Sequence, residues 1–437
     1  MMPAADVSQY WTPVYNVFNP FQPVPPEKLE AWFVERPDSP LSVILTHFRP
    51  DHLPERLILV GHPSSGKSSE LARLAADLAQ ARFGYFVINL DLSRNLNIER
   101  VNQVEVLFLM GVAAYKLAEE AKLEPDHKRF DALVKALETL VKTHTENETF
   151  EINMNSLLRG LVCFGAGALA GPVGAAAAIG AMEVFRDFNF ISGTDTNVVR
   201  KVEVEPKISE MLGHVNGILD DVRSKAGKPL ALRIDGLDRV RDEAVTEMLF
   251  VHNRFLAEVG GRVLYAAPVY VYYQPEFAPV RQAFQTVPFP NVRLRQRDHP
   301  QAGDEAGYAA MRQVVNRRLG SVGYLPNNTI AREALDRLIA ASGGVMRDLI
   351  RLVRDACVRA EIAGQTKIDS ETAHTVVAAL RREFEAQLTP KYQHVLDEVR
   401  KSKRRTEDPE CDLLLKGNFI LSYSNDNIWY DVHSILD

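Results

Sequence analysis

The chain has few cysteines and no excess of basic residues, and each shortage narrows the class of protein. Among 437 residues the only cysteines are Cys163, Cys357 and Cys411, whose spacing fits neither a disulfide framework nor a metal motif. We therefore expect a reducing, cytoplasmic setting in which they serve as small apolar side chains. The formal net charge of −6 excludes a surface that is basic overall, so a nucleic-acid contact would have to be a local patch.

A secretory signal is also missing, because residues 1–10 show no basic segment followed by an apolar one. Long hydrophobic runs are absent except for residues 161–182, which carry no charge and are long enough to span a bilayer. Gly167 and Gly171 would allow close helix packing there, whereas Gly171-Pro172 divides the run into short pieces. For residues 157–185 three interpretations stay open: membrane insertion, a packed helical hairpin or oligomer contact, and a Gly/Ala loop.

What the chain does contain is a glycine-rich loop that matches the pattern G-x-x-x-x-G-K-[ST]. An apolar run, residues 57–60, predicts a strand before the loop, and residues 69–75 predict a helix after it. In this setting backbone amides and the positive end of the helix dipole favour bound phosphate. The predicted nucleotide-binding residues are Gly61, His62, Pro63, Ser64, Ser65, Gly66, Lys67, Ser68 and Ser69. Lys67 would reach the β- and γ-phosphates of ATP, and the Ser68 hydroxyl would ligate Mg²⁺.

A second apolar run supplies the acidic partner that such a loop requires. Residues 230–234 predict a buried strand that ends at Asp235, and Asp238 follows three residues later. We expect Asp235 to be the Mg²⁺-linked acid and Asp238 to orient the attacking water.

The surrounding pattern alternates between strands and helices, as in an α/β domain with a parallel sheet. Ligands bind at the carboxyl ends of such strands, where Gly61, Asp91 and Asp235 all fall. The further predicted strands are residues 85–90, 262–267 and 292–294. An arginine, Arg347, opens a predicted helix after a glycine pair and could reach the γ-phosphate.

Together these motifs resemble the AAA+ ATPases, especially their origin-recognition-like and STAND branches. Residues 61–68 match the Walker A motif, residues 234–238 match a Walker B form of STAND proteins, and residues 342–347 look like the sensor-2 segment, so the resemblance implies that role for Arg347. Ala266-Ala267-Pro268 stands where this family usually has a polar sensor 1, and Tyr265 or Tyr270 could substitute. The resemblance also implies an arginine finger from a neighbouring subunit, for which the candidates are Arg281, Arg293, Arg295 and Arg297.

The C-terminal segment predicts helices followed by a β-hairpin, the order of a winged helix. Helices are expected over residues 369–387, 390–401 and 411–416, and strands over 419–423 and 428–432. Residues 400–405 form the most basic stretch of the chain, but acidic residues follow at once. This stretch is interpreted either as a phosphate-backbone contact or as a solvated linker, and the winged helix either as a DNA-binding element or as an internal clamp.

The sequence thus predicts an α/β P-loop NTPase of AAA+ type, with a helical lid and a C-terminal winged helix. The predicted segments are a lead-in (1–55), the ATPase core (56–300, with an insertion at about 145–200), the lid (301–365) and the winged helix (366–437). We expect a slowly hydrolysing ATPase switch that forms homo-oligomers with ATP and Mg²⁺, serving a prokaryotic antiviral defence or mobile-element system. The alternatives are a DNA-associated initiator- or transposition-type ATPase, and a membrane-acting effector gated by ATP through residues 157–185; a protein partner is not identified.

Overall fold

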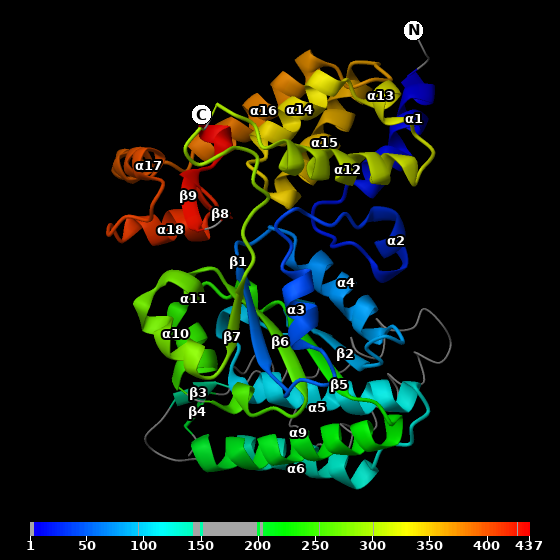
Figure 1. Cartoon of the computed structure of the whole chain (residues 1–437), viewed down its shortest axis with the longest axis vertical. Coiled ribbons are helices and arrows are strands. Elements are labelled where there is room, and N and C mark those ends of the chain that lie inside the picture. Colours follow the sequence, from blue (N-terminus) through cyan, green and yellow to red (C-terminus); the bar gives the residue numbers. More distant parts are fainter. Residues whose placement is uncertain are drawn as a thin grey trace. The chain divides into compact units, whose positions relative to one another are not determined.

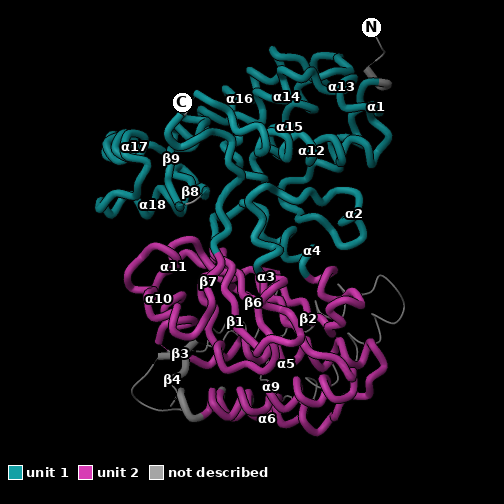
Figure 2. Tube along the Cα trace, in the orientation of Figure 1, with its two compact units in different colours: residues 1–43, 61–74, 288–437 teal, residues 44–60, 75–287 magenta. Residues whose placement is uncertain are grey.

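The computed structural model describes residues 4–437 except 95, 143–148, 152–198, 202–203, 253, 300 and 426. The described chain divides into two compact units (Figure 2). Unit 1 comprises residues 1–43, 61–74 and 288–437, and unit 2 comprises residues 44–60 and 75–287. Each unit has a hydrophobic core of its own.

Unit 2 is built around a five-stranded sheet with the strand order β2-β5-β6-β1-β7 (Figure 1). Its strands are β1 (Arg56–Gly61), β2 (Phe86–Asp91), β5 (Leu230–Asp235), β6 (Arg262–Pro268) and β7 (Gln285–Pro288). β2 pairs with β5, and β5 pairs with β6, both in parallel. Because β6 and most of β5 are buried on both faces, their side chains are almost continuously apolar rather than alternating.

One helical layer of unit 2 is formed by α5 (Gln103–Glu120), α6 (His127–Lys142) and α9 (Val204–Ala226), with α5 packed against the sheet (Figure 1). A capping box starts α5: the Asn102 side chain accepts from the Glu105 amide, and the Glu105 side chain accepts from the Asn102 amide. Nearly the whole of α5 is buried, since it lies between the sheet and α9. This unit also contains α10 (Glu243–Glu247), α11 (Tyr270–Tyr273) and the short strands β3 (Thr149–Glu151) and β4 (Val199–Lys201).

The predicted strand at residues 292–294 is wrong, because the fifth strand of the sheet is β7 instead. The Val292 amide donates to the Gly344 carbonyl and the Asp304 amide to the Leu294 carbonyl, which takes this segment into unit 1. The side chains of Val292 and Leu294 are buried in the helical core there. The apolar alternation was real, but it reports burial against helices rather than a place in the sheet.

Unit 1 is mainly helical. It contains α1 (Ala4–Val17), α2 (Leu29–Trp32), α12 (Glu305–Gly320), α13 (Pro326–Thr329), α14 (Arg332–Ala341), α15 (Met346–Ile362) and α16 (Ser370–Glu385). α1 packs against α15, and α14 against α16. Two helices cross the unit boundary: α3 (Leu41–His47) and α4 (Lys67–Ala79).

The C-terminal elements agree with the sequence prediction. They are α17 (Pro390–Ser402), α18 (Glu410–Lys416), β8 (Ile420–Ser424) and β9 (Ile428–Val432), and the two strands form an antiparallel hairpin. Asp369 caps α16 by accepting from the Thr372 amide, as its position before the apolar pattern predicts.

The uncharged run at residues 161–182 lies outside the described residues, and so does the whole of residues 157–185, for which membrane, hairpin and loop roles stay open. Within the described part of the chain, no helix is long and apolar enough to cross a membrane.

Candidate nucleotide-binding site

The glycine-rich loop joins β1 to α4, as its sequence setting predicts. Ser64 has φ 71° and Gly66 has φ 105°, so the backbone turns twice through the left-handed region before the helix starts at Lys67. Gly61 is required for a different reason: a Cβ atom there would lie 2.3 Å from the Phe289 carbonyl oxygen. The spacing of small residues is therefore dictated by backbone conformation and by close packing.

Lys67 is buried against its own loop, with only 3% of its surface exposed. Its Nζ atom donates to the carbonyl oxygens of Gly61 at 2.8 Å and His62 at 2.6 Å. The Ser65 hydroxyl donates to the same His62 carbonyl at 2.8 Å. These bonds place the ammonium group inside the turn, while Ser68 lies half-buried in the first turn of α4.

The β8–β9 hairpin region holds the outer side of the loop. The Ser422 amide donates to His62 Nε2 at 2.9 Å, and Asn418 Nδ2 donates to the Pro63 carbonyl at 3.1 Å. The His62 side chain is fully buried, and burial together with the nearby Lys67 charge lowers its pKa to about 3. His62 is therefore neutral at physiological pH, which leaves Nε2 able to accept the Ser422 hydrogen bond.

The lid helix α15 reaches the loop through Arg347. Its backbone amide donates to the Ser64 carbonyl at 3.2 Å, and its Nη1 atom donates to the Ser64 hydroxyl at 2.6 Å. Its Nε atom donates to the Pro20 carbonyl at 3.1 Å. Arg347 thus connects the lid, the phosphate loop and the proline-rich lead-in.

Arg36 is a loop contact that sequence reasoning missed. It is buried, it donates to the Ser65 carbonyl at 3.3 Å, and its guanidinium lies 4.2 Å from the centroid of the Phe289 ring. Burial lowers its pKa, although the neighbouring Glu70 carboxylate opposes this shift. No periodicity marks Arg36, because it lies in an irregular segment and its partners are distant in sequence.

Glu70 closes the same side of the loop from the first turn of α4. Its carboxylate accepts a hydrogen bond from the Ser39 hydroxyl. Its side chain is almost fully buried, and burial raises its pKa. The Ser69 hydroxyl accepts from the Val24 amide at 3.1 Å, so two residues of this turn are tied to the N-terminal segment.

In unit 2 the predicted acidic residues meet at the carboxyl edge of the sheet. Asp235 ends β5 and is the register partner of Asp91, which ends β2. Asp235 Oδ1 accepts from the Gly236 amide at 2.8 Å, and Asp238 is buried in the turn that follows. Arg233, two register pairs inside the sheet from Asp235, was not predicted. Burial lowers its pKa, and the charges of Asp235 and Asp91 oppose this shift. Arg94 also pairs with Asp91 at 3.0 Å, so this edge combines a buried and a half-buried carboxylate with two guanidinium groups.

The two tyrosines considered as sensor-1 substitutes are engaged within unit 2. The Tyr265 hydroxyl donates to the Leu256 carbonyl at 2.8 Å, and the side chain is fully buried. The Tyr270 hydroxyl donates to the Val240 carbonyl at 3.1 Å. Both hydroxyl groups thus stabilise the local fold.

The arginine-finger candidates differ in their surroundings. Arg293 pairs with Asp304 at 2.8 Å, and Arg295 pairs with Asp437 at 2.6 Å, so both have partners within the chain. Arg281 is exposed and Arg297 is half-buried.

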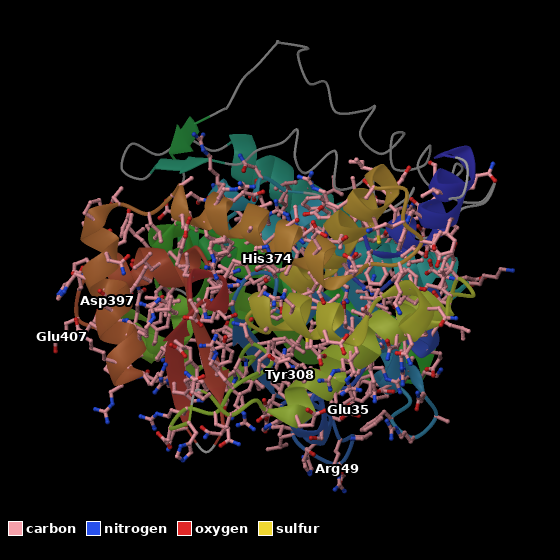
Figure 3. All side chains as sticks on the ribbon, turned by 90° about the horizontal axis from the view of Figure 1, so that it is seen from above. Glu35, Arg49, Tyr308, His374, Asp397 and Glu407 are labelled. Carbon is pink, nitrogen blue, oxygen red and sulfur yellow. The ribbon has the colours of Figure 1, made fainter. Side chains whose placement is uncertain are left out.

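The basic stretch at residues 400–405 is partly neutralised by carboxylates of unit 1. Three of its side chains have ion-pair partners: Arg400 with Asp397 at 3.0 Å, Lys403 with Asp431 at 2.7 Å and Arg405 with Asp412 at 2.9 Å. Figure 3 shows two carboxylates of this region, Asp397 on α17 and Glu407 in the segment between α17 and α18. Lys401 and Arg404 are exposed.

The loop of unit 1 has the features of an anion-binding turn. It presents the N-terminus of a 13-residue helix, two cations (Lys67 and Arg347) and several hydroxyl groups. Among the described residues, no three His, Cys, Asp or Glu side chains gather as metal ligands. A nucleotide-bound Mg²⁺ needs only one or two protein ligands, because phosphates and water supply the others.

No protein-family model and no curated protein matches the chain. Solved structures that resemble it include the Thermotoga maritima RuvB Holliday junction branch migration motor, with 11% identity and a TM-score of 0.36 over 90% of this chain and 89% of that chain. The Aeropyrum pernix ORC1 protein in complex with DNA has 12% identity and a TM-score of 0.38 over 96% and 94%. Drosophila ORC bound to DNA has 12% identity and a TM-score of 0.38 over 100% and 93%. At TM-scores below 0.5, this likeness says nothing about ligands or activity.

The parallel sheet with its phosphate loop and covering helices defines an α/β P-loop NTPase fold, which confirms the predicted fold class. The solved structures that resemble the chain include origin-recognition proteins, the group that the sequence motifs also resemble.

Proposed function

We propose that this protein is an ATP-binding, slowly hydrolysing switch of the AAA+/STAND type that oligomerises when ATP is bound. The observation that carries the proposal is the set of contacts on the phosphate loop. The lid contacts the loop through Arg347, and the C-terminal hairpin contacts it through Ser422. A conformational change in the loop would therefore alter both contacts.

Each residue then has a defined task. Lys67 would leave the carbonyl groups of its own loop and neutralise the β- and γ-phosphates, and Ser68 would provide the protein ligand to Mg²⁺. Arg347 already points its guanidinium at Ser64, and we assign to it the γ-phosphate contact. Asp235 would hold the metal's water shell, and Asp238 would orient the attacking water. Since Asp238 replaces the more usual glutamate next to Asp235, we expect slow turnover.

Nucleotide binding and turnover in three variants test this assignment. Lys67→Ala should reduce ATP affinity at least about 100-fold, because a charge-assisted contact with phosphate is worth about 1.5–3 kcal/mol and the lysine makes more than one. Asp235→Asn should retain binding and lose turnover. Calorimetric titration with ATP and phosphate release in single turnover measure the two effects, with Lys391→Ala on exposed α17 as the matched control. Full turnover in Asp235→Asn would contradict the assignment of Asp235 as the Mg²⁺-linked acid.

A second candidate is a DNA-associated ATPase that docks through its C-terminal elements. The observation in its favour is that Lys401 and Arg404 are exposed at the end of α17. Replacing both by glutamate should abolish the stimulation of ATP hydrolysis by duplex DNA. The remaining DNA affinity should depend less on salt, because lysine and arginine contacts with phosphate release counterions. Replacing the exposed Lys367 and Lys391 by glutamate controls for net charge. Equal stimulation in both pairs, or none in the wild type, would contradict DNA docking at this place.

The defence or mobile-element setting is proposed from the resemblance to STAND proteins alone. A cytoplasmic location is proposed from the few scattered cysteines together with that resemblance. A membrane role of residues 157–185 is a further proposal, and liposome flotation with and without ATP tests it.

A further inference from the structure

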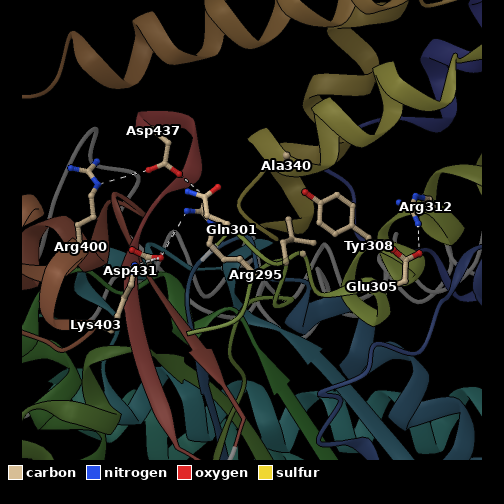
Figure 4. A pocket seen from close by; sticks show the side chains of 12 residues that line it. Arg295, Gln301, Glu305, Tyr308, Arg312, Ala340, Arg400, Lys403, Asp431 and Asp437 are labelled. Atoms are coloured by element: carbon tan, nitrogen blue, oxygen red, sulfur yellow. Dashed lines mark hydrogen bonds and ion pairs between the residues drawn. The ribbon is translucent and has the colours of Figure 1, made fainter. Parts of the chain in front are cut away.

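A second cavity in unit 1 lies apart from the phosphate loop. Its volume is about 650 Å³, within the usual range for small-molecule sites. Its walls come from the segment before α12, from α12, from the end of α14 and from the C-terminal elements α17 and β9 (Figure 4). None of the lining residues belongs to the loop at 61–69.

The cavity is lined by more cations than carboxylates. The cations are Arg295, Arg312, Arg400 and Lys403, and the carboxylates are Glu305, Asp431 and Asp437. Two of the carboxylates have fixed partners. Asp431 is almost fully buried and lies 2.7 Å from Lys403, while Glu305 lies 2.7 Å from Arg312, which also pairs with Asp336 at 2.6 Å.

Asp437 differs from these two because its carboxylate bridges two guanidinium groups that both line the cavity. One carboxylate oxygen is 2.6 Å from Arg295, the other is 3.8 Å from Arg400, and 41% of the side chain is exposed (Figure 4). An ion pair with this exposure contributes about 0–1 kcal/mol, so an incoming anion displaces it at little cost. Two arginines around one carboxylate match the geometry in which phosphate is bound bidentately.

The opposite side of the cavity suits a ring. Tyr308 lines it with a half-buried side chain, and the Arg312 guanidinium lies 5.4 Å from the centroid of that ring. Leu294 and Ala340 add apolar surface to the cavity, and the amide of Gln301, drawn beside Arg295 in Figure 4, offers both a donor and an acceptor. A flat heterocycle with polar edges would therefore contact apolar, aromatic and amide groups together.

We propose that this cavity binds a small phosphorylated ligand with an aromatic ring, of about the size of a mononucleotide. Its phosphate group displaces the Asp437 carboxylate between Arg295 and Arg400, and its ring contacts Tyr308. The site is independent of the phosphate loop, so it can exist whether or not the loop binds ATP.

Calorimetric titration with AMP tests this site, in the full-length Lys67→Ala variant so that the loop does not contribute. AMP should bind at least about 10-fold more tightly than adenosine or inorganic phosphate, because it engages both sides of the cavity. Arg295→Gln should weaken AMP at least about 10-fold. Asp437→Asn should strengthen AMP several-fold, because the competing carboxylate is removed.

Arg404→Gln is the matched control, since Arg404 is exposed next to the cavity but does not line it. Should Arg295→Gln lower the thermal midpoint of unfolding, Arg400→Gln replaces it. The proposal is overturned if AMP fails to bind, if adenosine binds as well as AMP, or if Asp437→Asn weakens AMP. Binding that survives Arg295→Gln and Arg400→Gln unchanged also overturns it, and places AMP elsewhere on the chain.

Discussion

Individual residues of the candidate site are chosen by backbone geometry as much as by chemistry. Gly61, Gly66 and Gly344 each stand where a side chain would meet backbone or where φ is positive. The chemistry of the loop depends on the residues that follow its glycines. Two of these, His62 and Lys67, are buried. A short polar motif therefore carries a large steric constraint.

Gly344→Ala should destabilise the protein by more than about 3 kcal/mol, since it combines a positive φ with a severe backbone clash. The added Cβ would lie 1.8 Å from the Val292 carbonyl oxygen at a φ of 80°. Urea unfolding followed by circular dichroism measures the loss. Gly320→Ala in α12 is the control, because its Cβ would meet no heavy atom within 4 Å, and its effect should stay within about 1 kcal/mol. Equal stability of the two variants would contradict the geometry at Gly344.

At the scale of elements, the β8–β9 hairpin and the phosphate loop are joined by a hydrogen bond that requires neutral His62. The folded pKa of His62 is about 3, below the ordinary value of 6.5. The unfolded chain therefore binds the extra proton first, and the contribution of His62 to stability is complete above pH 6.5. It falls as the pH drops from 6.5 towards 3, by up to about 1.4 kcal/mol for each pH unit.

His62→Gln should remove the pH-dependent contribution of residue 62 to the free energy of unfolding. Glutamine keeps an acceptor for the Ser422 amide and does not titrate. Between pH 7.5 and 5, the free energy of unfolding should fall by about 1–2 kcal/mol more in the wild type than in the variant. Urea titrations at both pH values measure this difference, with His374→Gln on the exposed face of α16 as the control. If the difference in free energy of unfolding between the wild type and His62→Gln does not change with pH, His62 does not titrate as described.

At the scale of the whole molecule, contacts within unit 1 link the functional parts. The hairpin that binds His62 also provides Asp431, the register partner of Leu421, to the second cavity. The next residue, Ser422, donates its backbone amide to His62 Nε2 in the phosphate loop. Loop, lid and C-terminal elements thus form one connected set of contacts, which is what a nucleotide-dependent switch needs.

The switch proposal predicts a nucleotide-dependent change in size. Asp238→Asn, which should bind ATP without turning it over, is expected to shift from monomer to oligomer with ATP and to stay monomeric with ADP. Size-exclusion chromatography with light scattering measures the mass, and duplex DNA is added as a further condition. Lys67→Ala should stay monomeric throughout. A constant mass in every condition would leave a nucleotide-binding protein without ATP-driven assembly.

The sequence by itself determined the local parts of this protein. A strand, a glycine-rich loop and a helix follow each other at residues 56–79 as predicted, because turn conformation and apolar pattern are properties of neighbouring residues. The same reason explains the cap of α16 and the C-terminal hairpin, which were also predicted.

The tertiary structure decided which segment completes the sheet and what holds the loop. Residues 292–294 have the pattern of a strand but pair with the lid, because burial alone does not say which surface covers a segment. Arg36, Asn418 and Ser422 reach the loop from parts of the chain that are far apart in sequence. Such contacts follow from chain packing rather than from local periodicity, so the sequence pattern did not predict them.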